Sequence, residues 1–167
     1  GLVASVRVNM GQAELRPELI PVKLSGDKVV ARPVTVGGRE YAITCVSMGN
    51  PHCVVFCDDL EKLNLVEIGP LFENNELFPD RVNTEFVEIM SRNQLRMRVW
   101  ERGSGETLSC GTGACASAVA AVLCGYADKD TDIKVRLLGG ELTIRYTDEA
   151  VFMTGECTKV FDGIVEI

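Results

Sequence analysis

The chain has 167 residues, of which 46% are hydrophobic, and this size and composition fit one globular domain with a buried core. Its 24 acidic residues outnumber its 17 basic residues, so the net charge of −7 repels phosphate backbones and anionic lipids. We therefore expect neither a nucleic acid nor a membrane as partner. No apolar run reaches the roughly 20 residues of a spanning helix and no signal-peptide pattern opens the chain, so we expect a cytoplasmic protein.

Periodicity predicts a strand-rich protein. Apolar and polar residues alternate in nine segments, and Gly139–Gly140 between two of them predicts a tight hairpin, because glycine accepts the positive φ of such turns. We therefore expect mostly antiparallel pairing. The segments are 5–10, 41–48, 52–57, 84–90, 94–100, 133–138, 141–146, 150–155 and 161–167.

Two segments predict helices. The first is 64–75, with Asn64 as a possible N-cap and Pro70 as an unfavourable interior residue. The second is 113–124, which has no polar face and must therefore be surrounded by protein, because it is too short to span lipid. Gly125 is a plausible C-terminal stop. We expect an α+β fold over residues 1–167, in which a curved, mostly antiparallel sheet or barrel wraps around one central apolar helix.

Cys110 precedes the second helix, where unpaired backbone N–H groups and the helix dipole favour negative charge. This position predicts a lowered thiol pKa. The N–H groups of Gly111 to Gly113 could also hold a carboxylate, which would place a bound acid beside a base. The alternative is an ordinary buried cysteine after a turn.

Two other readings of this region are weaker. "GTGACA" fits the dinucleotide fingerprint GxGxxA, with Asp130 or Asp132 about 20 residues further on, but the parallel βαβ context is missing. A zinc site is a further alternative, against which one histidine and irregular cysteine spacing argue, so we expect no metal. The cysteines are Cys45, Cys53, Cys57, Cys110, Cys115, Cys124 and Cys157.

Other candidate residues stand at the ends of expected strands. His52 follows the turn signal Asn50-Pro51, and turns beside strands often carry functional side chains. Glu101 and Arg102 close the strand 94–100 and lead into a glycine-rich turn. Taken separately, the histidine could be a packed residue and the charged pair a surface ion pair.

Four motifs in order, "GNPH" at 49–52, "VNTEF" at 82–86, "ERGSGET" at 101–107 and "SCGTGACA" at 109–116, resemble the carboxy-terminal half of diaminopimelate epimerases. The resemblance covers nearly the whole chain. It implies a cofactor-independent epimerase of lysine biosynthesis that interconverts LL- and meso-diaminopimelate by proton transfer between two cysteines.

The resemblance also implies roles for single residues. Cys110 matches one catalytic cysteine, and Glu101 and His52 match the polar groups that partner the two cysteines. Gly111 and Thr112 would hold the reacting carboxylate. Glu101 would also contact the substrate, and the distal amino acid end would be recognised by Asn50, Asn83 and Arg102.

This chain has a single C-G-x-G sequence, at Cys110. The resemblance therefore implies that the amino-terminal domain with the second cysteine is absent from the chain, which alone would be a half-site without turnover, and that a homodimer is possible. Two alternatives remain: another two-cysteine isomerase such as a proline racemase-like enzyme, or a non-catalytic binding or oligomerisation domain of the same fold.

Overall fold

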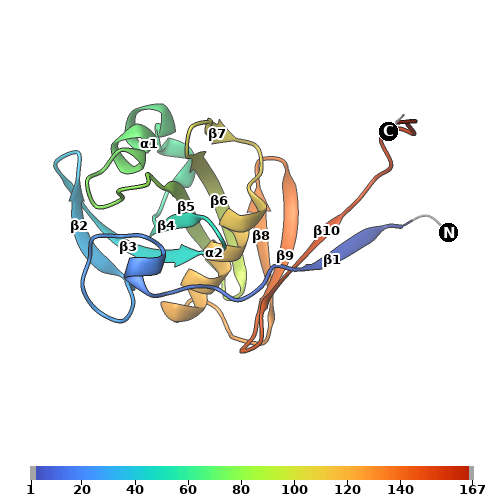
Figure 1. Cartoon of the computed structure of the whole chain (residues 1–167), viewed down its shortest axis with the longest axis horizontal. Helices are drawn as coiled ribbons and strands as arrows, with labels where there is room; N and C mark the ends of the chain where they lie inside the picture. The colour runs from blue at the N-terminus through green and yellow to red at the C-terminus, as the bar shows by residue number, and fades with distance from the viewer. Residues whose placement is uncertain (1–2, 166–167) are drawn as a thin grey trace.

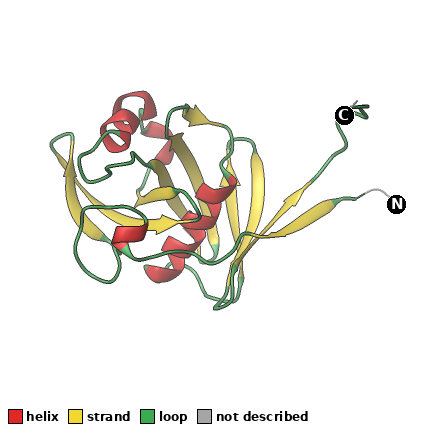
Figure 2. Cartoon of the chain, viewed as in Figure 1, coloured by secondary structure: helices red, strands yellow, loops and turns green. Residues whose placement is uncertain are grey.

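A computed structural model describes residues 3–165. In this part of the chain, ten strands, two α-helices and two short 3₁₀ helices follow one another (Figures 1 and 2). The strands are β1 (Ser5–Asn9), β2 (Arg32–Val36), β3 (Arg39–Ser47), β4 (Pro51–Phe56), β5 (Asn83–Ser91), β6 (Gln94–Glu101), β7 (Gly105–Thr107), β8 (Asp132–Leu137), β9 (Gly140–Tyr146) and β10 (Val151–Glu156); the α-helices are α1 (Leu65–Glu73) and α2 (Gly111–Leu123), and the 3₁₀ helices are Pro17–Leu19 and Leu60–Lys62.

All ten strands belong to one sheet. Its order is β1-β10-β9-β8-β6-β5-β4-β3-β2, with β7 paired to β6 beside this path. Only β4–β5 and β6–β8 pair in parallel among the described strands, which confirms the mostly antiparallel prediction. β1 and β2 are the two ends of the order and do not pair with each other, so the sheet is open rather than a closed barrel.

The second predicted helix lies inside the curve of the sheet (Figure 1). α2 contacts seven strands, β3 to β6 and β8 to β10, and residues 113–121 are all buried. Small side chains let the strands approach the helix closely, and the only polar one among them, Ser117, donates its hydroxyl to Met97 Sδ at 3.7 Å. The fold is therefore α+β, with a sheet wrapped around one central apolar helix.

α2 begins at Gly111, two residues earlier than predicted, and ends at Leu123, one residue earlier than predicted, with Cys124 as its C-cap and Gly125 next to it as the predicted stop. Gly125 has φ 81°, and its N–H donates to the Val122 carbonyl at 3.1 Å. The N–H of Tyr126 donates to the Ala121 carbonyl at 2.8 Å. These two bonds form the Schellman motif, which requires a residue in the left-handed conformation and so favours glycine.

The first predicted helix is confirmed as α1, which is shorter than the predicted 64–75; Asn64 occupies its N-cap position, but the Asn64 side chain makes no capping hydrogen bond. α1 packs against β5, β6 and β7, on a hydrophobic cluster separate from the one around α2, in which the ring of Phe72 meets those of Tyr41 and Phe86 edge-on. This packing stabilises α1 although Pro70 lies inside it.

The strand prediction for 161–167 is wrong for residues 161–165, which form no strand, and residues 166–167 lie outside the described residues. The other eight predicted segments are confirmed as strands. β2 and β7 were not predicted. None of the helices in residues 3–165 is long and apolar enough to cross a bilayer.

Candidate active site

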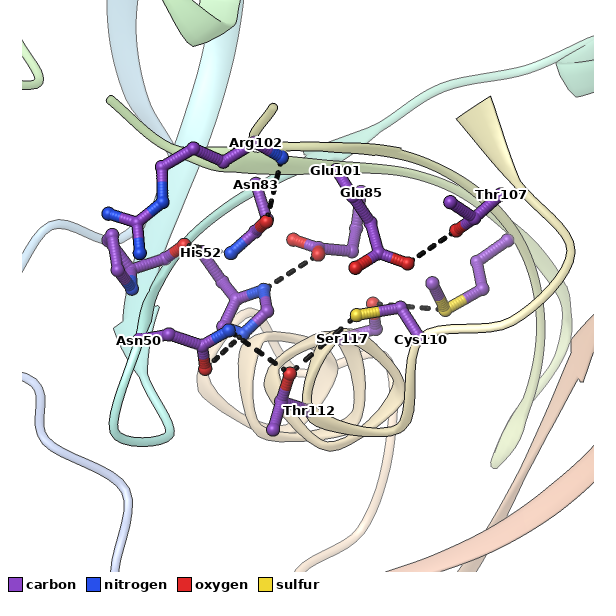
Figure 3. Close-up of polar contacts among 12 residues, drawn as sticks. Asn50, His52, Asn83, Glu85, Glu101, Arg102, Thr107, Cys110, Thr112 and Ser117 are labelled. Atoms are coloured by element: carbon purple, nitrogen blue, oxygen red, sulfur yellow. Dashed lines mark hydrogen bonds and ion pairs between the residues drawn. The ribbon is translucent and has the colours of Figure 1, made fainter. Parts of the chain in front are cut away.

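The predicted site residues other than Arg102 come from separate places in the fold and meet at the amino-terminal end of α2 (Figure 3). Asn50 lies in the turn between β3 and β4, and His52 in β4. The start of β5 brings Asn83 and the end of β6 brings Glu101. Parallel pairing places His52 beside Asn83 in the sheet. Some of these chain segments are far apart in sequence, so the site depends on the pairing of β4, β5 and β6.

Cys110 is the N-cap residue of α2, as expected, but its thiol does not have the predicted lowered pKa. The residue is only 7% exposed, and burial and the nearby carboxyl of Glu85 raise the pKa of Cys110 to about 11. The Thr112 hydroxyl and the Gly113 backbone N–H act in the opposite direction but do not compensate. The thiol is therefore protonated at neutral pH in this chain.

A series of polar contacts leads from the thiol into the sheet (Figure 3). Cys110 Sγ lies 3.6 Å from Thr112 Oγ1, which accepts a hydrogen bond from Asn50 Nδ2 at 3.4 Å. Asn50 Oδ1 lies 3.0 Å from His52 Nε2. These contacts bring four of the predicted residues together, although His52 itself makes no direct hydrogen bond to the thiol.

Glu85 was not predicted as a site residue, yet it lies at the centre of the site. Its side chain and that of His52 are both 0% exposed, and Glu85 Oε1 lies 2.7 Å from His52 Nδ1. Burial raises the pKa of Glu85, and the neighbouring Glu101 raises it further, while His52 lowers it. An acidic residue directly before the apolar pair Phe86 and Val87 in the predicted strand 84–90 was the sequence signal that could have identified it.

Glu101, at the end of β6, accepts a hydrogen bond from the hydroxyl of Thr107. β7 carries Thr107 and folds back along the end of β6, opposite Glu101 and its neighbours. Glu101 is half-buried and lies close to Cys110 and Glu85 (Figure 3). Two carboxyl groups therefore flank one thiol.

The side chains of Asn83 and Arg102 make hydrogen bonds to backbone groups around the site. Asn83 Oδ1 accepts from the backbone N–H of Arg102 at 2.9 Å, and its Nδ2 donates to the Pro51 carbonyl at 2.9 Å. Arg102 Nη1 donates to the Asp80 carbonyl at 2.8 Å, so this guanidinium points away from Cys110 (Figure 3). In this structure, Arg102 is not brought together with the other predicted site residues.

The turn that follows Glu101 is anchored by Glu73 at the end of α1. Glu73 Oε1 accepts from the Gly103 N–H at 2.8 Å and from Arg81 Nη1 at 2.9 Å, and its Oε2 accepts from Trp100 Nε1 at 2.7 Å. Burial alone would raise the pKa of Glu73, but these bonds together lower it. The sequence pattern gave no indication of this anchor.

Gly113 allows Glu85 and the thiol to approach the same point of α2. A methyl group there would lie 2.6 Å from Glu85 Oε1 and 3.1 Å from Cys110 Sγ. Because Glu85 is fully buried and cannot move freely, we expect Gly113→Ala to lower the free energy of unfolding by about 1–3 kcal/mol in denaturant titrations. Gly111→Ala is the matched control, because its methyl would meet the flexible end of Met153. Equal losses in both variants would contradict this account.

The seven cysteines are all unpaired. Within residues 3–165, no three His, Cys, Asp or Glu side chains are grouped as ligands of a metal ion.

The comparison with solved structures supports the fold. A probable proline racemase from Agrobacterium radiobacter, crystallised with bound carbonate, is 16% identical with a TM-score of 0.63, covering 95% of this chain and 54% of its own. At this identity the similarity shows a shared fold.

The comparison with sequences identifies the family. A diaminopimelate epimerase of Synechocystis sp. is 52% identical over 166 residues, covering 97% of this chain and 59% of the relative. Another, of Desulfovibrio desulfuricans, is 55% identical over 172 residues, covering 98% and 59%. The chain thus spans about three fifths of the length of these relatives. The family model described as diaminopimelate epimerase matches residues 44–160, and the chain belongs to the diaminopimelate epimerase family.

Proposed function

We propose that this chain forms the carboxy-terminal half of a diaminopimelate epimerase and supplies one of its two catalytic thiols. The observation that carries the proposal is the position of Cys110, at the start of a buried helix and beside the carboxyl groups of Glu85 and Glu101. The epimerases named above are its relatives at more than 50% identity.

Inversion of a carbon centre needs a base on one face to remove the α-proton and an acid on the other face to return one. Cys110 supplies one of these groups. Among the described residues it is the only cysteine at the N-cap of a helix, whereas Cys115 lies within α2 and Cys124 at its end. We propose that the second thiol comes from an amino-terminal domain that packs over this end of α2.

The raised pKa of Cys110 supports a first role as the acid. A neutral thiol with a raised pKa is ready to donate, so Cys110 acts as the acid when the opposite cysteine removes the proton, and as the base in the reverse direction. A domain that closes over the site would exclude water and strengthen the electrostatic interactions of the two thiols with the substrate.

The start of α2 would stabilise the negative charge that develops on the substrate during proton removal. The backbone N–H groups at Gly111 and Thr112 belong to the unpaired first turn and would bind the reacting carboxylate, where negative charge grows as the α-proton leaves. Such preorganised donors would take the place of a cofactor, and we propose that none is needed. Glu101 would bind the substrate amino group.

We propose that Asn50, Asn83 and Arg102 recognise the distal amino acid end of diaminopimelate. This role requires Arg102 to leave the Asp80 carbonyl when substrate binds. His52 would be the polar group that partners the second cysteine. The complete enzyme would act in lysine biosynthesis in the cytoplasm, as a homodimer that sedimentation would detect.

The test completes the enzyme with the amino-terminal part of the Synechocystis relative. We expect the completed protein to invert diaminopimelate and to exchange its α-hydrogen with deuterium from solvent, and to leave proline unchanged. The chain alone should show neither activity. Stereoinversion of diaminopimelate by the chain alone, at the rate of the completed enzyme, would contradict the half-site, and turnover of proline would favour the racemase alternative.

A further inference from the structure

The contacts at the start of α2 continue beyond the residues used above. From the Cys110 thiol they pass through Thr112, Asn50 and His52, and end at Glu85 (Figure 3). Glu85 is the only member of the series to which the proposed reaction gives no role. It is also fully buried, and its second oxygen, Oε2, makes no hydrogen bond within the described residues.

The geometry determines where the protons lie. Asn50 Nδ2 faces the Thr112 hydroxyl, so Asn50 Oδ1 faces His52 and can only accept a hydrogen bond. His52 Nε2 must therefore carry a proton. His52 Nδ1 and Glu85 Oε1, 2.7 Å apart, would both be acceptors without a proton, so one proton lies between them.

The surroundings retain this shared proton. Glu85 is faced by His52 and Cys53 from β4, by Glu101 from β6 and by Cys110 from α2. His52 is the only one of these groups that becomes cationic. Burial and Glu101 both disfavour an unpaired carboxylate at Glu85 and raise its pKa, so they favour a proton between Glu85 Oε1 and His52 Nδ1 over a bare carboxylate.

We propose that Glu85 is a positioning residue: through the proton shared with His52 it fixes Nε2 as a donor, and so turns the Asn50 amide N–H toward the start of α2. Without Glu85, the imidazole could place its single proton on Nδ1, and Nε2 would then repel Asn50 Oδ1. The Asn50 side chain would be free to rotate, and a donor beside Thr112 would be lost. The consequence for turnover rests on the proposed epimerase function, but the proton arrangement does not.

The first experiment is nitrogen-15 NMR of His52 in the unaltered chain, which has a single histidine and thus one pair of ring signals. Around neutral pH we expect a protonated Nε2 and a strongly deshielded proton in the bond between Nδ1 and Glu85. An unprotonated Nε2 would overturn the proposal. This measurement needs no variant, so it decides even if a Glu85 variant fails to fold.

The variants Glu85→Gln and Glu85→Leu separate positioning from packing. The glutamine amide can donate to Nδ1 and so keeps the proton on Nε2, whereas leucine offers no partner. We expect the deshielded proton to disappear in both variants, with Nε2 remaining protonated only in Glu85→Gln. Identical histidine spectra for the unaltered chain and both variants would overturn the proposal. Glu88→Gln, on the same strand but bonded to Arg96, is the matched control and should not change the spectrum.

Turnover is measured in the protein completed with the amino-terminal part of the relative. We expect Glu85→Leu to raise KM for diaminopimelate about tenfold and Glu85→Gln to keep KM close to that of the parent, because Asn50 stays oriented. An equal rise in both variants would overturn the proposal. If the completed parent enzyme shows no turnover, the proposed function fails, while the NMR measurement still decides the role of Glu85.

Discussion

Replacing Cys110 with serine is expected to lower kcat for diaminopimelate epimerisation in the completed enzyme by about 10²–10⁴-fold. A serine hydroxyl is similar in size to the thiol but is far harder to deprotonate, so it cannot take the α-proton in one direction. The backbone N–H groups at Gly111 and Thr112 remain in place, so substrate binding should be retained and KM should change little. Steady-state kinetics in both directions give the two constants separately.

The control for this variant is Cys124→Ser, at the other end of α2. Cys124 Sγ lies 3.4 Å from Thr44 Oγ1, so a serine there can keep a hydrogen bond and should leave kcat unchanged. A Cys110→Ser enzyme with full activity would remove Cys110 from the reaction. A variant with unchanged kcat and a strongly raised KM would instead assign Cys110 to substrate binding.

The elements predicted from the sequence are those that local patterns determine. α2 was predicted because small apolar residues on all its faces require burial, and β5 and β6 because apolar alternation persists over their length. β7 has three residues and exists only because the glycine turn folds it onto β6. The alternation in 161–165 was misleading, because a strand also needs a neighbouring strand with which to pair.

The site was predicted only in part, because local motifs identify single residues but not the contacts between distant segments. Motifs identified Cys110, Asn50 and His52, whose contacts are now explained by the fold. The pKa of the thiol was predicted in the wrong direction, because burial of the thiol outweighs the backbone N–H groups of the helix and depends on strands far away in the sequence. Glu85 lies on β5 and approaches Cys110 at the start of α2 from the sheet. The parallel pairing of β4 with β5 brings Glu85 beside His52.

Gly69→Ala is expected to cause a larger loss of stability than Gly113→Ala. Gly69 is buried in α1, and a methyl group there would lie 2.2 Å from Cδ2 and 2.4 Å from Cγ of Trp100. The indole is rigid, and its Nε1 is held by Glu73, so it cannot move aside without losing that hydrogen bond. We expect the free energy of unfolding to fall by about 3 kcal/mol or more, which exceeds the gain of about 1 kcal/mol from replacing a helical glycine.

Denaturant titration of the chain measures this loss, with Val66→Ala on the exposed side of α1 as the control, expected to stay within about 0.5 kcal/mol of the parent. The double variant Gly69→Ala with Trp100→Leu should lose less free energy of unfolding than the sum of the two single variants, because the smaller leucine side chain leaves room for the methyl group. Full additivity of the two losses would show that the methyl group and the indole do not meet.

The same substitution is expected to affect the candidate site from a distance. Glu73 holds both Trp100 and the Gly103 N–H, so a displaced indole also displaces the turn that carries Glu101 and Arg102. In the completed enzyme at a temperature where Gly69→Ala remains folded, we expect a raised KM for diaminopimelate together with a lowered kcat, because both residues are proposed to contact the substrate. A destabilised variant with parental kinetics would show that the turn keeps its position without the contact to Glu73 at the end of α1. Glu101 would then be oriented mainly by its hydrogen bond from Thr107 in β7.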